Sequence, residues 1–196
     1  MTPGRTDRMA LFNRKKPRDT SALHAALTRG TLDHFETVYE PAWVHYRYEH
    51  DTLLTLALTN ADSPSRVAIC NRLLDDGADV REATPLHRFL ARNQHDFTAE
   101  APLLQRLLDA GADVNEVDSK VGTPLETLAG KFKFSDVELG PFYDVLLARP
   151  DLDLLQVSIF GRTVLGNLRK WSGGRGELVV RAEQTLADRG IPVPPP

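Results

Sequence analysis

Thr84-Pro85-Leu86-His87 has the residue types of a helix start. A threonine hydroxyl can cap the first turn of a helix, and proline is tolerated at the first helical position because its missing N–H has no partner there. Further along, Leu103 and Leu104 precede Leu107-Leu108-Asp109-Ala110-Gly111-Ala112-Asp113-Val114-Asn115. These leucines follow the i, i+3, i+4 spacing of an amphipathic helix, and Gly111 can adopt the left-handed conformation that ends one. The stretch therefore predicts a helix, a loop and a second helix.

Weaker versions of the same pattern occur along the chain. Aligned on the position of Thr84, they begin at Ser21, Thr52, Thr84, Thr123 and Thr163, in steps of 31, 32, 39 and 40 residues. Self-similarity at such a period is typical of a solenoid, in which each unit buries its apolar face against its neighbours. We expect five units, near residues 20–51, 52–83, 84–122, 123–162 and 163–196.

The quoted segments resemble the ankyrin repeat, whose signature is a TPLH helix start and a leucine-rich second helix closed by glycine. The resemblance extends over residues 20–196 and is strongest in the third and fourth units. It implies an all-α fold, an ankyrin-like helical repeat solenoid of about five degenerate units. We expect lengthened loops between paired helices at 93–102, 130–140 and 172–176, the last of them flexible, and projecting fingers at 115–122 and 155–162. The segment 77–84 is too short for a finger.

Charge is distributed unevenly along the chain. The formal net charge is −3, but residues 1–19 hold six basic and two acidic residues, so the remainder is −7. We expect residues 1–19 to be a disordered basic arm and residues 20–196 to be the repeat domain. An acidic body argues against nucleic-acid binding, which needs a concentrated positive surface. No apolar run approaches the ~20 residues of a membrane span, and no signal peptide is recognisable, so we expect a soluble, cytoplasmic protein.

Few residues are candidates for catalysis or metal binding. The single cysteine, Cys70, excludes an internal disulfide and a cysteine zinc site. His24 and His87 align with the TPLH histidine, where the resemblance implies a structural role in hydrogen bonds between neighbouring repeats. His45 and His50 lack the i, i+4 spacing of a helical metal pair. We therefore expect no catalytic, cofactor-binding or metal site, and a protein that is not an enzyme.

The resemblance implies protein binding through the finger tips and the exposed side of the first helix of each pair. Carried over residue by residue, that surface comprises Arg88, Arg92, Glu116, Asp118, Ser119, Lys120, Thr127, Phe160, Arg162, Asn167 and Lys170. A second candidate is the segment that contains Trp43, Tyr46 and Tyr48. Trp, Tyr and Arg are enriched in binding hot spots, but the same aromatic residues can fill a gap in an irregular N-terminal cap. Both readings of this segment stay open.

The biological role rests on a looser resemblance. A short, degenerate, acidic array is similar to the small stand-alone ankyrin proteins of bacteria, several of which resemble immunity proteins that bind and block a cognate toxin. An acidic surface would suit a basic toxin through complementary charge. We expect a chain that is monomeric on its own and binds such a toxin or effector. The alternative is a regulatory adaptor that tethers an enzyme or a transcription factor.

Overall fold

The computed structural model describes residue 17 and residues 19–195, which form ten α-helices and a two-stranded sheet. Contacts divide the chain into two compact units, with the boundary between Asp79 and Val80. No helix in the described residues is both long and apolar enough to cross a membrane. The basic arm expected over residues 1–19 lies outside the described residues, apart from Pro17 and Asp19.

The N-terminal unit, up to Asp79, contains two helix pairs and a hairpin. Helix α1 packs against α2 and α3, and α3 packs against α4. The side chain of Asp19 caps α1 by accepting hydrogen bonds from the amides of Ser21 and Ala22. The helix therefore starts before the aligned position Ser21. The elements of this unit are α1 (Thr20–Arg29), α2 (Leu32–Val38), a 3-10 turn (Pro41–Trp43), β1 (Arg47–Tyr48), β2 (Asp51–Thr52), α3 (Leu53–Ala57) and α4 (Ser63–Asp75).

The aromatic side chains of Trp43, Tyr46 and Tyr48 are partly or fully buried in this unit. Trp43 is only 7% exposed. Tyr48 donates a hydrogen bond to the carbonyl of Thr20, and its ring meets those of His24 and Tyr46 edge-on. Burial raises the pKa of Tyr48 to about 12. Residues 47–52 form an antiparallel hairpin leading into α3.

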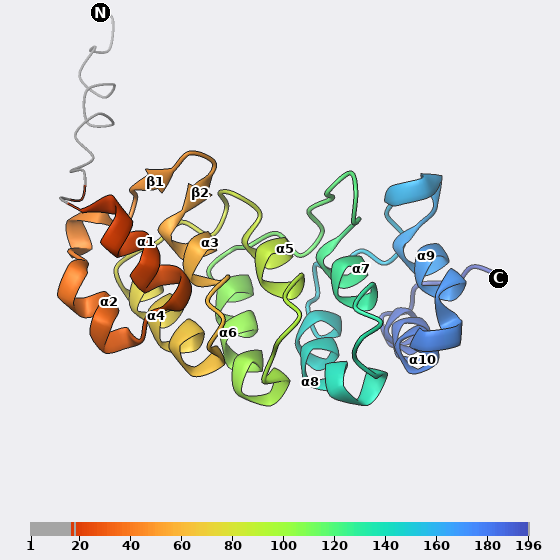
Figure 1. Cartoon of the computed structure of the whole chain (residues 1–196). Coiled ribbons are helices and arrows are strands. Elements are labelled where there is room, and N and C mark those ends of the chain that lie inside the picture. The colour runs from red at the N-terminus through yellow and green to blue at the C-terminus, as the bar shows by residue number, and fades with distance from the viewer. Residues whose placement is uncertain (1–16, 18, 196) are drawn as a thin grey trace, which may run out of the picture. The chain divides into compact units, whose positions relative to one another are not determined.

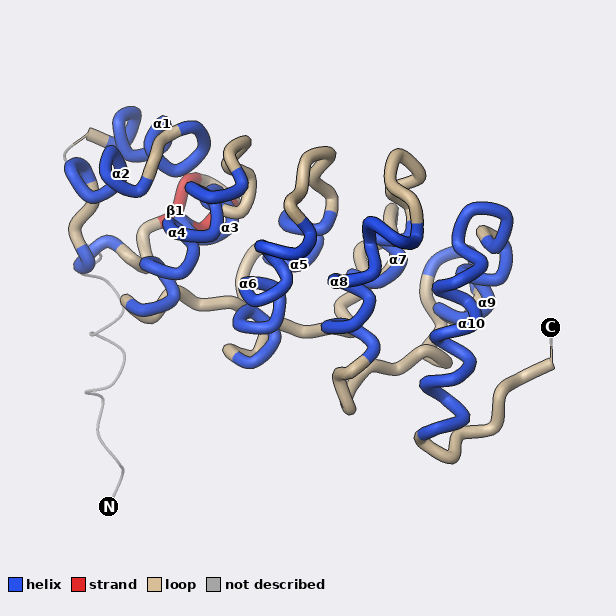
Figure 2. Tube along the Cα trace, turned by 90° about the horizontal axis from the view of Figure 1, so that it is seen from below, coloured by secondary structure: helices blue, strands red, loops and turns tan. Residues whose placement is uncertain are grey.

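The C-terminal unit, from Val80, contains three helix pairs. Figure 1 shows the first helices α5, α7 and α9 in one row and the longer second helices α6, α8 and α10 in another. Figure 2 shows the members of each pair side by side. Contacts run along both rows, from α5 through α7 to α9 and from α6 through α8 to α10. The elements are α5 (Pro85–Leu90), α6 (Phe97–Asp109), α7 (Pro124–Ala129), α8 (Asp136–Leu147), a 3-10 turn (Ile159–Gly161), α9 (Val164–Lys170) and α10 (Ser172–Asp188).

The loops within these pairs are shorter than the sequence suggested. Asp96 caps α6, and Ser135 forms a capping box with Glu138 at the start of α8. As a result Pro102 and Pro141 lie inside helices instead of preceding them. The glycine-rich segment 172–176, expected to be a flexible loop, is the kinked first part of α10.

Thr84 does not cap its helix through its hydroxyl. An N-cap residue normally has extended backbone, but Thr84 has φ 50° and ψ 58° and makes no side-chain capping bond. Ala83 before it also has positive φ. By contrast, the hydroxyls of Thr52, Thr123 and Thr163 each accept a hydrogen bond from an amide in the first turn of their helix.

The leucine stripes form the core of the C-terminal unit. Leu86, Leu103, Leu104, Leu107 and Leu108 are all buried. Beside them, the rings of Phe89, Phe97 and Phe142 meet around His95. The expected register of the third repeat is therefore that of the structure.

We expect Leu86→Ala and Leu107→Ala each to lower the free energy of unfolding by about 2–5 kcal/mol, because each leaves a cavity in a packed core. Val137→Ala is the control, since Val137 is 79% exposed on α8. Denaturant melts measure all three variants. Changes below about 0.5 kcal/mol for both leucines, the range of surface substitutions, would contradict the core assignment.

Candidate protein-binding surface

Two hairpin-like fingers precede α7 and α9 in the C-terminal unit (Figure 1). In the first finger, residues 115–122, Asp118 and Gly122 exchange two backbone hydrogen bonds of 3.0 and 2.9 Å. The Asp118 carboxylate also accepts hydrogen bonds from the amides of Lys120 (2.7 Å) and Val121 (3.2 Å). The amide of Lys120 makes the largest contribution to lowering the pKa of this carboxyl group. Asp118 thus shapes a turn that presents Lys120 and Val121 to solvent.

The second finger, residues 155–162, holds an aromatic residue in a strained conformation. Val157 bridges Thr163, and the amide of Ser158 donates to the carbonyl of Arg162 at 2.8 Å. At the tip, Phe160 has φ 59° and is 72% exposed. Such left-handed backbone is unfavourable for a residue with a Cβ atom. The finger therefore exposes a large apolar side chain to water, and the residue that carries it has an unfavourable backbone conformation.

Asn115 joins the bases of the two fingers. Its side-chain amide donates to the carbonyl of Asp151 at 2.6 Å, and its side-chain oxygen accepts from the amide of Asp153 at 2.8 Å. The side chain of Gln156 donates to the backbone carbonyl of Asn115 at 2.7 Å. Three hydrogen bonds therefore connect neighbouring repeats where the fingers begin.

Glu126 on α7 fixes the second finger and α9 from inside the unit. It is 1% exposed. Its Oε2 atom accepts from the amide of Thr123 at 2.7 Å and from the hydroxyl of Ser158 at 2.6 Å, and Oε1 accepts from Asn167 Nδ2 at 2.7 Å. A buried charge is costly unless it is hydrogen-bonded. Three donors from α7's own cap, the second finger and α9 supply those bonds, so the three segments are fixed to one carboxylate.

Between the fingers and the first helices lies a groove of about 330 Å³. Small residues at the end of α5 and α7, Ala91 and Gly130, leave space along it. The lining residues are Ala91, Lys120, Val121, Glu126, Thr127, Gly130, Lys131, Ile159, Phe160 and Trp171. We call this set the finger groove.

One wall of the finger groove is supported by a buried arginine. The Trp171 ring meets Phe132 edge-on at 6.5 Å between centroids, and the Arg175 guanidinium lies 5.0 Å from the centre of the Phe132 ring. Arg175 is buried and donates to the carbonyls of Ala129 (2.7 Å) and Phe134 (3.1 Å). The kink in α10 at Arg175 thus serves to attach that helix to the loop after α7.

His87 has the structural role that the resemblance implied. Its Nδ1 atom is 2.9 Å from the hydroxyl of Thr127 in the next repeat, and its Nε2 atom is 3.2 Å from the carbonyl of Glu116 in the first finger. His24 differs, because its side chain is exposed and packs against Tyr48.

The structure divides the proposed contact residues by accessibility. Arg88, Ser119, Lys120, Phe160, Arg162 and Lys170 are exposed, and Arg92, Glu116, Asp118, Tyr46 and Tyr48 are half-buried. Trp43, Thr127 and Asn167 are buried. Thr127 and Asn167 were expected to contact a partner. Instead, Thr127 forms a hydrogen bond with His87, and Asn167 forms one with Glu126.

Sequence reasoning did not include Val121, Lys131 or Ile159 in the surface. Val121 and Ile159 are apolar residues within the segments expected to form the fingers, and that was the available signal. Lys131 lies in the expected loop 130–140. Its Nζ atom donates to the carbonyl of Ala91 at 2.5 Å, which places it at the groove.

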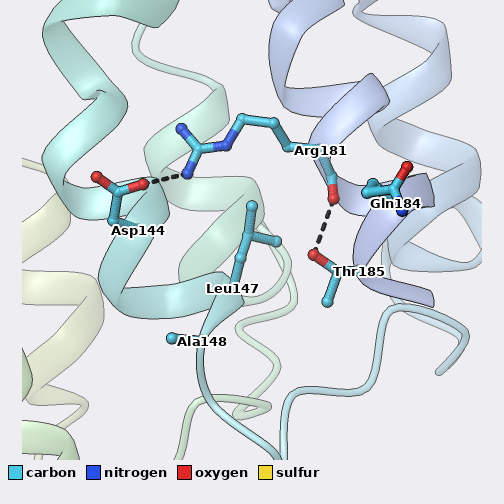
Figure 3. A pocket seen from close by; sticks show the side chains of 6 residues that line it. All are labelled: Asp144, Leu147, Ala148, Arg181, Gln184 and Thr185. Atoms are coloured by element: carbon cyan, nitrogen blue, oxygen red, sulfur yellow. Dashed lines mark hydrogen bonds and ion pairs between the residues drawn. The ribbon is translucent and has the colours of Figure 1, made fainter. Parts of the chain in front are cut away.

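A second hollow, of about 340 Å³, lies between α8 and α10 (Figure 3). Arg181 forms an ion pair with Asp144 across it, and the Thr185 hydroxyl donates to the Arg181 carbonyl. The Gln184 side chain donates to Asp188, so the polar side chains around this hollow already have partners within the chain. In the described part of the chain, no group of three or more His, Cys, Asp or Glu side chains is arranged to hold a metal ion.

Two glycine variants test whether Glu126 fixes the finger base. Gly122 and Gly161 both have positive φ, and alanine in that conformation costs about 1–2 kcal/mol. A Cβ atom at Gly122 would also clash with Glu126 Oε2, whereas one at Gly161 meets nothing within 4 Å. We expect Gly122→Ala to destabilise the protein by about 1–3 kcal/mol more than Gly161→Ala, because it disrupts a buried hydrogen-bonded group. If denaturant melts showed the same loss of unfolding free energy for both variants, Glu126 would not fix the finger base.

The comparisons with known proteins agree with this architecture. Residues 81–119 match the family model of the ankyrin repeat. The fold is similar to the crystal structure of a functionally unknown protein from Leptotrichia buccalis C-1013-b, with a TM-score of 0.64 and 19% sequence identity over 88% of this chain and 96% of that one. No curated protein matches the sequence. The matched repeat spans α5 and α6, so the chain contains an ankyrin repeat within an all-α, ankyrin-like repeat fold.

Proposed function

We propose that this chain is a non-enzymatic binding protein whose partner contacts the fingers and finger groove of the C-terminal unit. The ankyrin repeat is itself a protein-interaction domain without catalytic groups. The observation that carries the proposal is Phe160, which is exposed at the tip of a strained finger. Strained, exposed positions of this kind persist only where the surroundings hold them, and they concentrate at functional sites.

The fingers are suited to binding because their shape is set before a partner arrives. Asp118, Asn115 and Glu126 fix the turns and their bases through internal hydrogen bonds. A preorganised surface loses little conformational freedom on association. Phe160 and Val121, which is 42% exposed, then offer apolar area at its centre. Aromatic anchors of this kind dominate binding energy in many interfaces.

The local charge of this surface differs from the charge of the whole chain. The first helices α5, α7 and α9 contain three basic residues and one acidic residue, the buried Glu126. The second helices α6, α8 and α10 contain eight acidic and three basic residues. Among the helices of the C-terminal unit, the negative charge therefore lies on the second helices. A partner that meets the fingers encounters a more positive surface than the net charge suggested.

For the biological role we favour an immunity protein that binds and blocks a cognate toxin or effector. Small size, a preformed binding surface and a family fold without catalytic groups support it. Because the finger surface is more positive than the chain as a whole, the region of the toxin that contacts it need not be basic, even if the toxin has a net positive charge. The adaptor that tethers an enzyme or transcription factor remains the second candidate, and it predicts several weaker partners instead of one tight one.

Co-expression tests the immunity role. The protein encoded next to this chain is expressed alone, with this chain, and with its Phe160→Ala variant. We expect growth arrest by the neighbour alone, rescue by the intact chain, and weaker rescue by the variant. A harmless neighbour would remove the immunity role. If affinity purification also returned several unrelated weak partners, the adaptor would be the better description.

Calorimetry with the purified partner tests the surface itself. We expect Phe160→Ala to weaken binding at least about 30-fold, because loss of a central aromatic anchor typically costs 2 kcal/mol or more. Val137→Ala should leave affinity unchanged, since Val137 is exposed on α8, away from the fingers. Equal affinity of both variants would place the contact on another surface.

A further inference from the structure

The finger groove combines apolar walls with two lysines from neighbouring repeats. Val121, Ile159, Phe160 and Trp171 supply the apolar part, while Lys120 from the first finger and Lys131 from the end of α7 supply positive charge. Its volume of about 330 Å³ lies within the range of about 300–1,000 Å³ typical of ligand pockets. The groove is therefore large enough for a bulky side chain of a partner.

The carboxylate in the lining does not neutralise these lysines by direct pairing. Glu126 is buried, and its two oxygens accept hydrogen bonds from Thr123, Ser158 and Asn167. Lys120 is exposed at the finger tip. Beyond the lining, Arg162 and Lys170 are exposed next to the segments that carry Phe160 and Trp171.

Lys131 is held in a positively charged environment. Its hydrogen bond to Ala91 keeps its ammonium group at the groove, while Lys133 is held similarly by the carbonyl of Asn93 at 2.9 Å. Burial lowers the pKa of Lys131, and the positive charges of Arg92 and Lys133 lower it further. An anion at the groove would offset both effects.

We infer that the finger groove binds an acidic segment of the partner protein. Carboxylates of that segment pair with Lys120 and Lys131, and an adjacent aromatic or large aliphatic side chain lies against Phe160 and Trp171. The inference rests on the proposed function, since it names the chemistry recognised by the same surface. Single-stranded nucleic acid also combines negative charge with stacking bases, but the acidic second helices and the small groove favour a peptide.

Gly130 allows a test that leaves the charges intact. Its φ of −68° is ordinary for any residue, and a Cβ atom there would lie 3.4 Å from the Glu126 carbonyl oxygen, an ordinary contact. Gly130→Leu should therefore fill the groove without disturbing the fold. Gly140→Leu is the matched control, because Gly140 lies on α8 and a Cβ atom there meets nothing within 4 Å.

The probe is a phage-displayed library of random 12-residue peptides selected on the full chain. We expect enriched peptides to carry Asp or Glu next to an aromatic or large aliphatic residue. Selection on Lys120→Glu/Lys131→Glu, checked for an unchanged circular dichroism spectrum, should enrich Lys and Arg instead. The best peptide should bind about tenfold or more weakly to Gly130→Leu and equally to Gly140→Leu, as expected for loss of a central contact.

Trp171 reports where the peptide binds. Subtracting the fluorescence of Trp171→Phe from that of the intact chain isolates its signal, which should change on peptide addition and respond less to a thymidine oligonucleotide. Enrichment of basic peptides, no enrichment, indifference to Gly130→Leu, or preference for the oligonucleotide would overturn the inference. If the cognate partner binds through Phe160 but ignores both lysine reversals, the proposed function holds and this inference fails. If no partner binds at all, the proposed function fails instead.

Discussion

Burial of the Glu126 carboxylate is the constraint on which the binding surface depends. Helix α7 is only six residues long, and so short a helix is marginal without tertiary contacts. Its capping box, the second finger and α9 all use the same two oxygens. Because an unsatisfied buried charge is costly, these segments are held together in one arrangement. The position of Phe160 follows from that arrangement.

The same principle recurs between other repeats of the C-terminal unit. His87 joins α5 to α7 and to the first finger. Lys131 and Lys133 attach the loop after α7 to the loop after α5 in the preceding repeat. Arg175 attaches α10 to the loop after α7. Each bond links a polar side chain to a backbone or side-chain group that is 29 to 46 residues away in the sequence. Polar groups thus set the register between repeats, while leucines supply the non-directional packing beneath them.

Separation of charge between the two rows of helices gives the unit two chemically different sides. The second helices carry eight of the nine carboxylates in the two rows. Some of these form ion pairs, such as Asp144 with Arg181 of α10 and Glu183 with Arg169 of α9. The finger groove instead brings Lys120 and Lys131 to an apolar surface. A partner is therefore selected by local charge and shape, and the net charge of the chain is a poor guide to it. Local complementarity of this kind governs specificity and association rate.

The sequence by itself determined the repeat architecture of this protein. Leucine spacing identified Leu103, Leu104, Leu107 and Leu108 as core, and Gly111 marked a helix end, where the structure has φ 100°. Turn-forming segments located both fingers. These features are local, because periodicity and turn chemistry depend on residues close in the chain. The capping box of Ser135 and Glu138 is likewise a local pattern, a serine followed three residues later by a glutamate.

Only the tertiary structure decided which polar and aromatic residues face solvent. Trp43, Thr127 and Asn167 have the residue types of a binding surface but are buried, the latter two in hydrogen bonds to other repeats or elements. Thr84 looks like a cap, yet its backbone is left-handed. Lys131 and Trp171 lie 40 residues apart and meet in one groove with Lys120. Burial, hydrogen-bond partners and local charge depend on segments that are distant in sequence, so a periodic pattern cannot assign them.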